Sequence, residues 1–128
     1  MKLRVRHNSL RFRLGQSEVE SFWTTGTCRE TIDFPGGGRF EYTLTASDNG
    51  KKLDASFANG VVTVTIPKDE LNVWHSSDLV GIRASVDVSA AEKLLVLIEK
   101  DFRCIDERVE EDQSDALENP LGVPQSCG

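Results

Sequence analysis

The sequence has few of the residues on which catalytic, metal-binding or cross-linked domains commonly rely. Among its 128 residues are two histidines, one methionine and three cysteines, Cys28, Cys104 and Cys127. The cysteines are odd in number and widely spaced, and none belongs to a Cys-x-x-Cys pair. Disulfide frameworks need paired cysteines, and structural zinc sites need closely spaced ligands. We therefore expect free thiols, a reducing compartment, no metal ligand set and no cofactor.

Long hydrophobic runs are also missing. The longest, residues 94–98, falls far short of the roughly 20 apolar residues that span a bilayer. The first six residues alternate between charged and apolar side chains, whereas a signal peptide needs an unbroken apolar stretch. We expect no membrane span and no secretion signal, so the cytoplasm is the default location.

Acidic charge is concentrated at one end of the chain. The net charge is −6, and residues 106–128 hold seven acids against Arg108 alone. This segment accounts for the whole excess, so we expect a neutral single domain over residues 1–105 and an acidic C-terminal tail over 106–128. The start of the chain, from Met1 to Arg13, carries five bases and no acid. A neutral body with few aromatic residues argues against a nucleic-acid partner.

Alternation of apolar and polar residues predicts an α+β domain built on a mostly antiparallel β-sheet. Two short helices are expected at 17–25 and 68–75, where apolar residues recur at helical spacing behind Ser17 and Pro67. Strands are expected over residues 2–6, 10–14, 28–34, 39–46, 51–58, 61–66, 79–88 and 94–102.

Two segments of the chain resemble each other. Each segment leads from a predicted strand through a polar turn into a Glu-aliphatic pair, and an aromatic residue follows. The first comprises residues 14–19 and Phe22, and the second comprises residues 66–71 and Trp74. We call the constant spacing from Leu14 to Ile66 the repeat offset. The match predicts a duplicated β-α-β-β unit; the alternative is that any strand-to-helix junction has this pattern. A duplicated unit can close into a barrel-like or curled sheet, which would remove exposed edge strands.

This topology resembles that of the triphosphate tunnel enzymes, whose barrel is a doubled β-α-β-β-β unit. The resemblance implies a metal-dependent phosphohydrolase as one function. The first strand of those enzymes carries an alternating Glu-x-Glu-x-Lys motif that holds metal. Residues 2–6 here read Lys-Leu-Arg-Val-Arg, which has the opposite charge at the metal-binding positions.

Two motifs resemble those of a family of small bacterial proteins of unknown function. They are Asn-Ser-Leu-Arg-Phe-Arg-Leu at residues 8–14 and Glu-Lys-Asp-Phe-Arg-Cys at residues 99–104. The similarity spans nearly the whole chain. It implies a bacterial source and carries no assigned activity.

Arginines near the start of the chain are the best candidates for a binding site. Arg4 and Arg6 share one face of a predicted strand, and Arg11 and Arg13 share one face of the next. If the two strands pair, the four guanidiniums lie within about 5–10 Å of one another and offer planar forks to phosphate or carboxylate groups. We therefore predict an anion-binding face.

Carboxylates on neighbouring strands provide the competing interpretation. Glu41, Glu99 and Asp101 could pair with the arginines and form a polar ladder without any ligand. Glu99 and Asp101 also share a strand face, so they could serve as an acid/base pair or hold a divalent ion. We assign no catalytic residue and no metal ligand at this point.

Three functional hypotheses follow from these features. The first is a binding or accessory domain whose arginine face accepts a small anionic ligand. The second is an enzyme acting on phosphorylated compounds through the same arginines with Glu99 and Asp101. The third is a protein–protein adaptor that acts through the acidic tail, which could instead fold back and shield the basic strands.

Overall fold

The computed structural model describes residues 1–48 and 51–101, which form eight strands and two helices. The α+β class predicted from the sequence is confirmed. Because the described part ends at residue 101, the predicted acidic tail and the boundary at residue 105 lie outside it. In chain order the elements are β1 (Lys2–Arg6), β2 (Ser9–Leu14), α1 (Gln16–Thr25), β3 (Thr27–Asp33), β4 (Arg39–Ser47), β5 (Asp54–Ala58), β6 (Val61–Pro67), α2 (Lys68–Ser76), β7 (Gly81–Asp87) and β8 (Lys93–Lys100).

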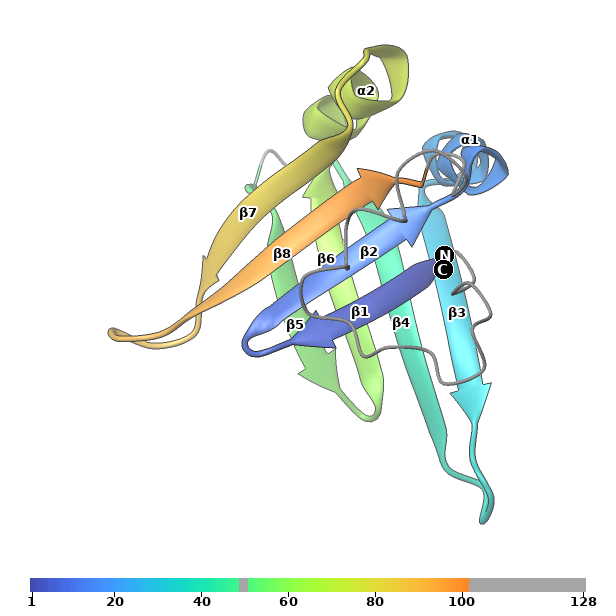
Figure 1. Ribbon diagram of the computed structural model, residues 1–128, viewed down its shortest axis with the longest axis vertical. Helices are drawn as coiled ribbons and strands as arrows, with labels where there is room; N and C mark the ends of the chain where they lie inside the picture. The colour runs from blue at the N-terminus through green and yellow to red at the C-terminus, as the bar shows by residue number, and fades with distance from the viewer. Residues whose placement is uncertain (49–50, 102–128) are drawn as a thin grey trace, which may run out of the picture.

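The strands form two four-stranded sheets that face each other, with both helices at one end (Figure 1). Sheet A has the order β1-β2-β8-β7, and sheet B has the order β3-β4-β6-β5. Helix α1 connects β2 in sheet A to β3 in sheet B, and α2 connects β6 in sheet B to β7 in sheet A. Each sheet therefore contains one hairpin from the first half of the chain and one from the second half.

Of the two forms expected, a curled sheet or a barrel, the closed barrel is not found among the described strands. Each helix moves the chain from one sheet to the other, so the eight strands never form one continuous sheet that could close on itself. Both sheets are also mixed, because the two hairpins of each sheet meet through a parallel pair, β2 with β8 and β4 with β6. All other pairings are antiparallel, as predicted.

The two halves of the chain have the same strand registers. Lys2 pairs with Arg13 in the hairpin of β1 and β2, and Asp54 pairs with Thr65 in the hairpin of β5 and β6. Equivalent residues of these two hairpins are therefore separated by the repeat offset on both strands. Thr27 pairs with Thr45 in the hairpin of β3 and β4, and Gly81 pairs with Glu99 in the hairpin of β7 and β8. The spacing between equivalent residues of these two hairpins is therefore longer than the repeat offset by two residues on both strands. The two added residues fall between α2 and β7. The structure is thus an internal repeat related by a pseudo-twofold axis.

The hairpin turns repeat as well. His7 and Asn59 are the two non-glycine residues with positive φ in the described ranges, at 51° and 54°, and they too are separated by the repeat offset. Such values suit the tight turns that join twisted antiparallel strands. The predicted turn at Asn59-Gly60 is confirmed, and His7 occupies the equivalent position in the first hairpin.

The helices meet at the pseudo-twofold axis through reciprocal contacts. The rings of Trp23 and His75, which are equivalent positions of the repeat, stack with centroids 4.1 Å apart. Trp23 Nε1 donates to Asn72 Oδ1 at 2.9 Å, and His75 Nε2 lies 2.7 Å from Glu20 Oε2. Glu20 and Asn72 are also equivalent positions, so each helix contributes an aromatic ring and an acceptor to the same contact.

Several element boundaries differ from those expected. Helix α1 begins at Gln16, and its N-cap is Gly15 instead of Ser17, because the Glu18 carboxylate accepts the Gly15 N–H at 2.9 Å. Gly26 ends this helix in the left-handed conformation, as predicted. The predicted strand at 51–58 begins only at Asp54.

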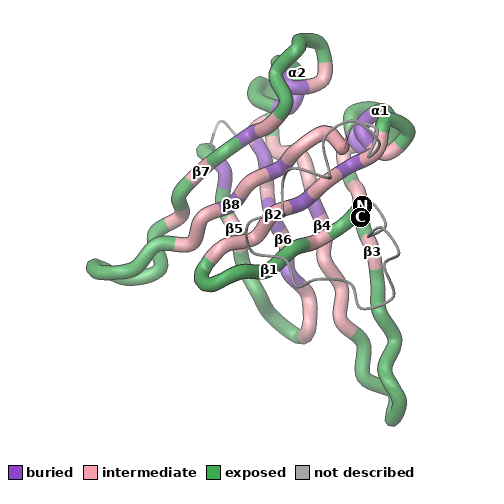
Figure 2. Tube along the Cα trace, viewed as in Figure 1, coloured by how far each residue is buried: buried purple, intermediate pink, exposed green. Residues whose placement is uncertain are grey.

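The core lies between the two sheets and beneath the helices (Figure 2). Alternate residues of the inner strands face it, and each helix adds an aromatic side chain. The Trp74 indole is fully buried and donates to the Val80 carbonyl at 2.9 Å. Among the described residues, the large fully buried side chains are Phe12, Leu14, Phe22, Leu44, Val64, Ile66, Leu71, Trp74, Val96 and Ile98.

Phe22→Ala is expected to lower the free energy of unfolding by about 3–5 kcal/mol, because it leaves a cavity beneath α1. Denaturant unfolding followed by circular dichroism measures this change. Phe34→Ala is the matched control, since Phe34 is 53% exposed and its loss should cost about 1 kcal/mol or less. Equal losses in the two variants would contradict this position of the core.

Candidate functional site

The outer face of sheet A, which points away from sheet B, carries most of the basic side chains of the first half of the chain. Register partners in a sheet share a face. Arg4 is opposite Arg11, and Lys2 is opposite Arg13, so the hairpin of β1 and β2 places all four on one face. We call this surface the arginine face; its basic residues are Lys2, Arg4, Arg6, Arg11, Arg13, Arg83 and Lys93.

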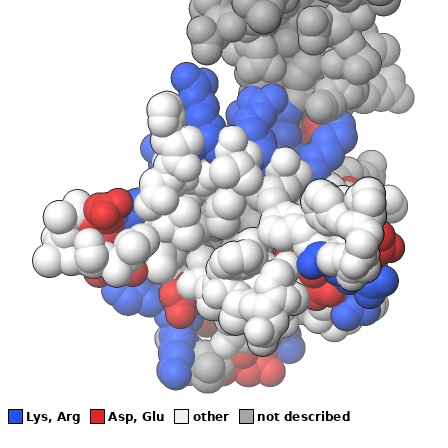
Figure 3. All heavy atoms as spheres, turned by 90° about the horizontal axis from the view of Figure 1, so that it is seen from below, with Lys and Arg blue, Asp and Glu red and all other residues white. Residues whose placement is uncertain are grey.

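Alternation along β2 determines which side chains point outward. Phe12 and Leu14 are fully buried against sheet B, so Arg11 and Arg13 lie on the opposite side. Figure 3, seen from the end opposite the helices, shows a group of Lys and Arg side chains at the top of the view, while others lie among Asp and Glu elsewhere on the surface. The structure therefore brings together the four arginines chosen from the sequence.

Two carboxylates at the end of β8 meet this face. Glu99 Oε1 accepts a hydrogen bond from Arg11 Nε at 2.7 Å and lies 3.6 Å from Arg13 Nε. Asp101 Oδ2 accepts a hydrogen bond from Lys2 Nζ at 3.2 Å. These contacts agree with the predicted ladder of acids and bases. Asp87 and Lys93, which share this face by register, also pair with each other, so within the described residues three acids stand against seven bases. The described part of the face therefore carries a net positive charge.

A glycine allows Glu99 to lie flat on the sheet. Gly81 is the register partner of Glu99, and a Cβ added there would lie 3.1 Å from the Ile98 carbonyl oxygen and 3.3 Å from Glu99 Cγ. Such close approach leaves no room for a larger residue without a shift of β8. Gly81 thus helps to keep the Glu99 carboxylate directed toward Arg11.

Two expectations about this face need correction or addition. Glu41 does not belong to it, because β4 lies in sheet B and the Glu41 carboxylate accepts a hydrogen bond from Thr43 at 3.0 Å. Arg83 belongs to it but was not chosen from the sequence. The alternation of β7 puts Arg83 outward, but only the adjacency of β7 to β8 shows which arginines it accompanies.

The outer face of sheet B provides an internal comparison. Because the two halves share their registers, Arg4, Arg11 and Arg13 have positional counterparts in the hairpin of β5 and β6. Those counterparts, at the repeat offset, are Ser56, Thr63 and Thr65. The same backbone is therefore built without arginine at these positions, and the basic residues are not a requirement of the fold.

Other chemical groups singled out from the sequence lie elsewhere. His75 stacks on Trp23 between the helices, and His7 is in a turn, so the two histidines do not share a site. Cys28 is a free thiol in β3, and burial, the main cause, raises its pKa, which favours the unreactive thiol form. Cys104 and Cys127 lie outside the described residues.

The described ranges contain neither a membrane-crossing helix nor a metal-binding cluster. Across residues 1–48 and 51–101, no helix is both long enough and apolar enough to cross a membrane. In the same ranges, no three His, Cys, Asp or Glu side chains come together in a way that could hold a metal ion.

Comparison with known proteins gives one match. A family model described as "Family of unknown function (DUF7009)" matches residues 1–121. No curated protein and no solved structure matches the chain.

Glu99→Gln is expected to lower the free energy of unfolding by about 1–3 kcal/mol, because the half-buried guanidiniums of Arg11 and Arg13 lose their shared carboxylate. Asp33→Asn is the matched control: it breaks the ion pair with Arg39, in which both side chains are more than 60% exposed, so it should change little. Denaturant unfolding at low salt measures both, and equal effects would show that Glu99 does not hold the arginine face.

Proposed function

We propose that this chain, which belongs to the family of unknown function DUF7009, is a binding module whose arginine face takes up multivalent anions. The proposed ligand-binding residues are Arg4, Arg6, Arg11 and Arg13. The ligand class is a small molecule or a protein segment that carries several phosphate or carboxylate groups.

The contrast between the outer faces of the two sheets is the observation that supports this proposal. Arg4 and Arg11 are directly opposite each other, and like charges at such positions destabilise a sheet. Their counterparts Ser56 and Thr63 avoid this repulsion on an equivalent backbone. Arginine at positions where the equivalent strands carry serine or threonine is a charge that the fold does not require, and this contrast supports an anion-binding role for the face.

The spacing of the guanidiniums suits a ligand with more than one charge. Opposite residues on paired strands are about 5 Å apart, and alternate residues along a strand are about 6.5–7 Å apart. Each guanidinium can form two parallel hydrogen bonds to a phosphate or carboxylate. Because Glu99 already orients Arg11, less side-chain freedom is lost when a ligand binds there.

Binding is favoured here over the metal-dependent phosphohydrolase. The carboxylates that could act at this face, Glu99 and Asp101, each contact a basic side chain. An acid committed to a cation is poorly placed to hold a metal ion or to move a proton. The adaptor hypothesis rests on residues 106–128, which lie outside the described part of the chain.

We also place the protein in the cytoplasm. The free Cys28 thiol supports a reducing compartment. Fractionation of the source cells tests this, and the bacterial source remains an expectation from the family resemblance.

Isothermal titration of the full chain with inorganic triphosphate and with a hexaglutamate peptide tests the arginine face. We expect at least one of the two to bind, with affinity that falls as salt rises. Arg4→Ser and Arg11→Thr copy the residues of sheet B, so each should fold normally and weaken binding about tenfold or more.

Arg29→Thr is the control for charge alone, because Arg29 is exposed on β3 of sheet B. It should leave affinity within about twofold of the native value. The proposal is wrong if neither probe binds, or if Arg29→Thr weakens binding as much as Arg11→Thr. Binding of only one probe identifies the anion as phosphate or carboxylate.

A further inference from the structure

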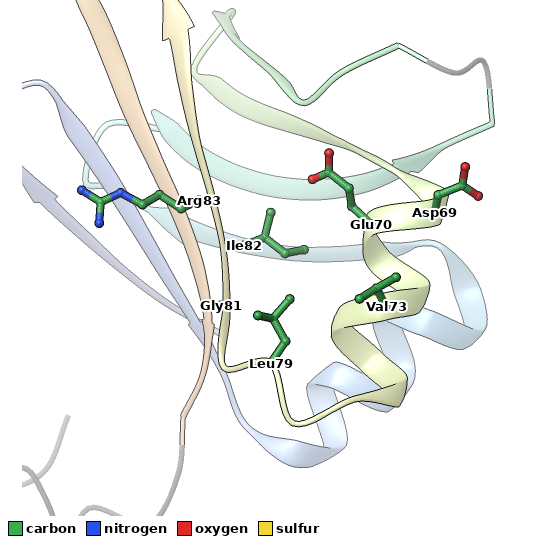
Figure 4. A pocket seen from close by; sticks show the side chains of 7 residues that line it. All are labelled: Asp69, Glu70, Val73, Leu79, Gly81, Ile82 and Arg83. Carbon is green, nitrogen blue, oxygen red and sulfur yellow. The ribbon is translucent and has the colours of Figure 1, made fainter.

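A cavity of about 380 Å³ lies between α2 and the beginning of β7, on the side of β7 away from β8 (Figure 4). Val73 lines it from the helix, and Leu79 and Ile82 line it from the strand and the segment before it. The Glu70 carboxylate lies at one end. We call this cavity the α2–β7 groove.

The walls of the α2–β7 groove are apolar and accessible. Val73 is 56% exposed and Leu79 is 46% exposed, while Ile82 is buried at the base. Val80, next to Leu79, is also 46% exposed. Adjacent exposed aliphatic side chains around a hollow are uncommon on a soluble domain unless they contact a partner.

The internal repeat shows that the fold does not require these apolar residues. The counterpart of Val73 at the repeat offset is Ser21 in α1. Counting back from the shared register of β3 and β7, Leu79 and Val80 correspond to Thr25 and Gly26. The first half thus makes a shorter helix-to-strand connection, with polar or small residues in place of Leu79 and Val80.

The free edge of β7 borders the groove. Within residues 1–48 and 51–101, β7 pairs only with β8, so its other edge presents N–H and C=O groups to an added strand. An extended peptide that binds such an edge gains affinity from backbone hydrogen bonds and specificity from pockets for alternate side chains. The α2–β7 groove is such a pocket.

The charge at the groove indicates which side chain of a bound peptide would fit there, next to an apolar side chain of the same peptide. Glu70 is the counterpart of Glu18, which accepts the N–H of the α1 N-cap, Gly15. The α2 N-cap is Pro67, which has no N–H, so Glu70 lacks this role. With Asp69 next to it, Glu70 makes the helix side of the groove acidic and complementary to Lys or Arg, whereas Arg83 lines the groove from β7.

From these observations we infer that the α2–β7 groove binds an extended peptide segment of another protein. The segment adds to the edge of β7 and places an aliphatic side chain between Val73 and Leu79. A Lys or Arg two residues away, about 6.5–7 Å along the strand, contacts Glu70. This surface borders the arginine face, because Arg83 lines the groove and also belongs to that face.

NMR titration of the full chain with the peptide acetyl-Thr-Val-Thr-Lys-Thr-Val-Thr-amide tests the inference. We expect amide shifts confined mainly to α2 and β7. The double variant Val73→Ser with Leu79→Thr copies the first half of the repeat, so it should fold and bind about tenfold more weakly. Val5→Thr removes a 65% exposed aliphatic side chain from the edge strand β1 and should have no effect.

A second comparison keeps the test informative if the double variant unfolds. Replacing Lys by Glu in the peptide should weaken binding to the native chain, and this preference should be lost in Glu70→Gln. The inference is overturned if the peptide causes no shifts in β7, if Lys and Glu peptides bind equally, or if sedimentation shows that the groove is covered by a second copy of the chain.

Discussion

Two parallel strand pairs, β2 with β8 and β4 with β6, hold the structure together. In the part of the chain that the structure describes, each is the single strand pairing between the two hairpins of its sheet, and each joins a hairpin of one half of the chain to a hairpin of the other. Neither half can complete a sheet alone, because its two hairpins lie in different sheets. Parallel pairing needs long connections between strands, and the α-helices that cross between the sheets provide part of each. The stacked rings of Trp23 and His75 then fix the two helices against each other.

Because the two halves share a backbone, comparing their residues shows which side chains the fold requires and which it does not. Buried positions match in kind: Phe22 corresponds to Trp74, and Leu14 to Ile66. Several surface positions do not match, among them positions on sheet A and α2. Where sheet A carries Arg4, Arg11 and Arg13, the equivalent places of sheet B carry serine and threonine, and Val73 of the α2–β7 groove replaces Ser21 of α1. We therefore assign function to the surfaces at which the residues of the two halves differ.

Much of the fold follows from local patterns, whereas its assembly does not. The alternation in residues 2–14 places Arg11 and Arg13 opposite Phe12, and the repeat offset is visible between residues 14–19 and 66–71. The exchange of hairpins between halves has no local signal, because β2 and β8 lie near opposite ends of the described chain. For the same reason the sequence predicts a carboxylate near the arginines but not that Glu99 serves Arg11 and Arg13 together. The N-cap at Gly15 was missed because the Glu18 side chain, not Ser17, satisfies the helix start.

One variant tests most directly whether the basic residues serve function and not folding. Its arginine face copies sheet B, and the quantity to measure is its free energy of unfolding. The variant replaces four residues by their counterparts in the repeat: Arg4→Ser, Arg11→Thr, Arg13→Thr and Glu99→Thr. Because Glu99 leaves together with Arg11 and Arg13, this carboxylate is not left without its basic partners, and stability at low salt should stay within about 1 kcal/mol of the native chain. A loss of about 3 kcal/mol or more would mean that the arginine face holds the fold together, and would contradict its assignment as a binding surface.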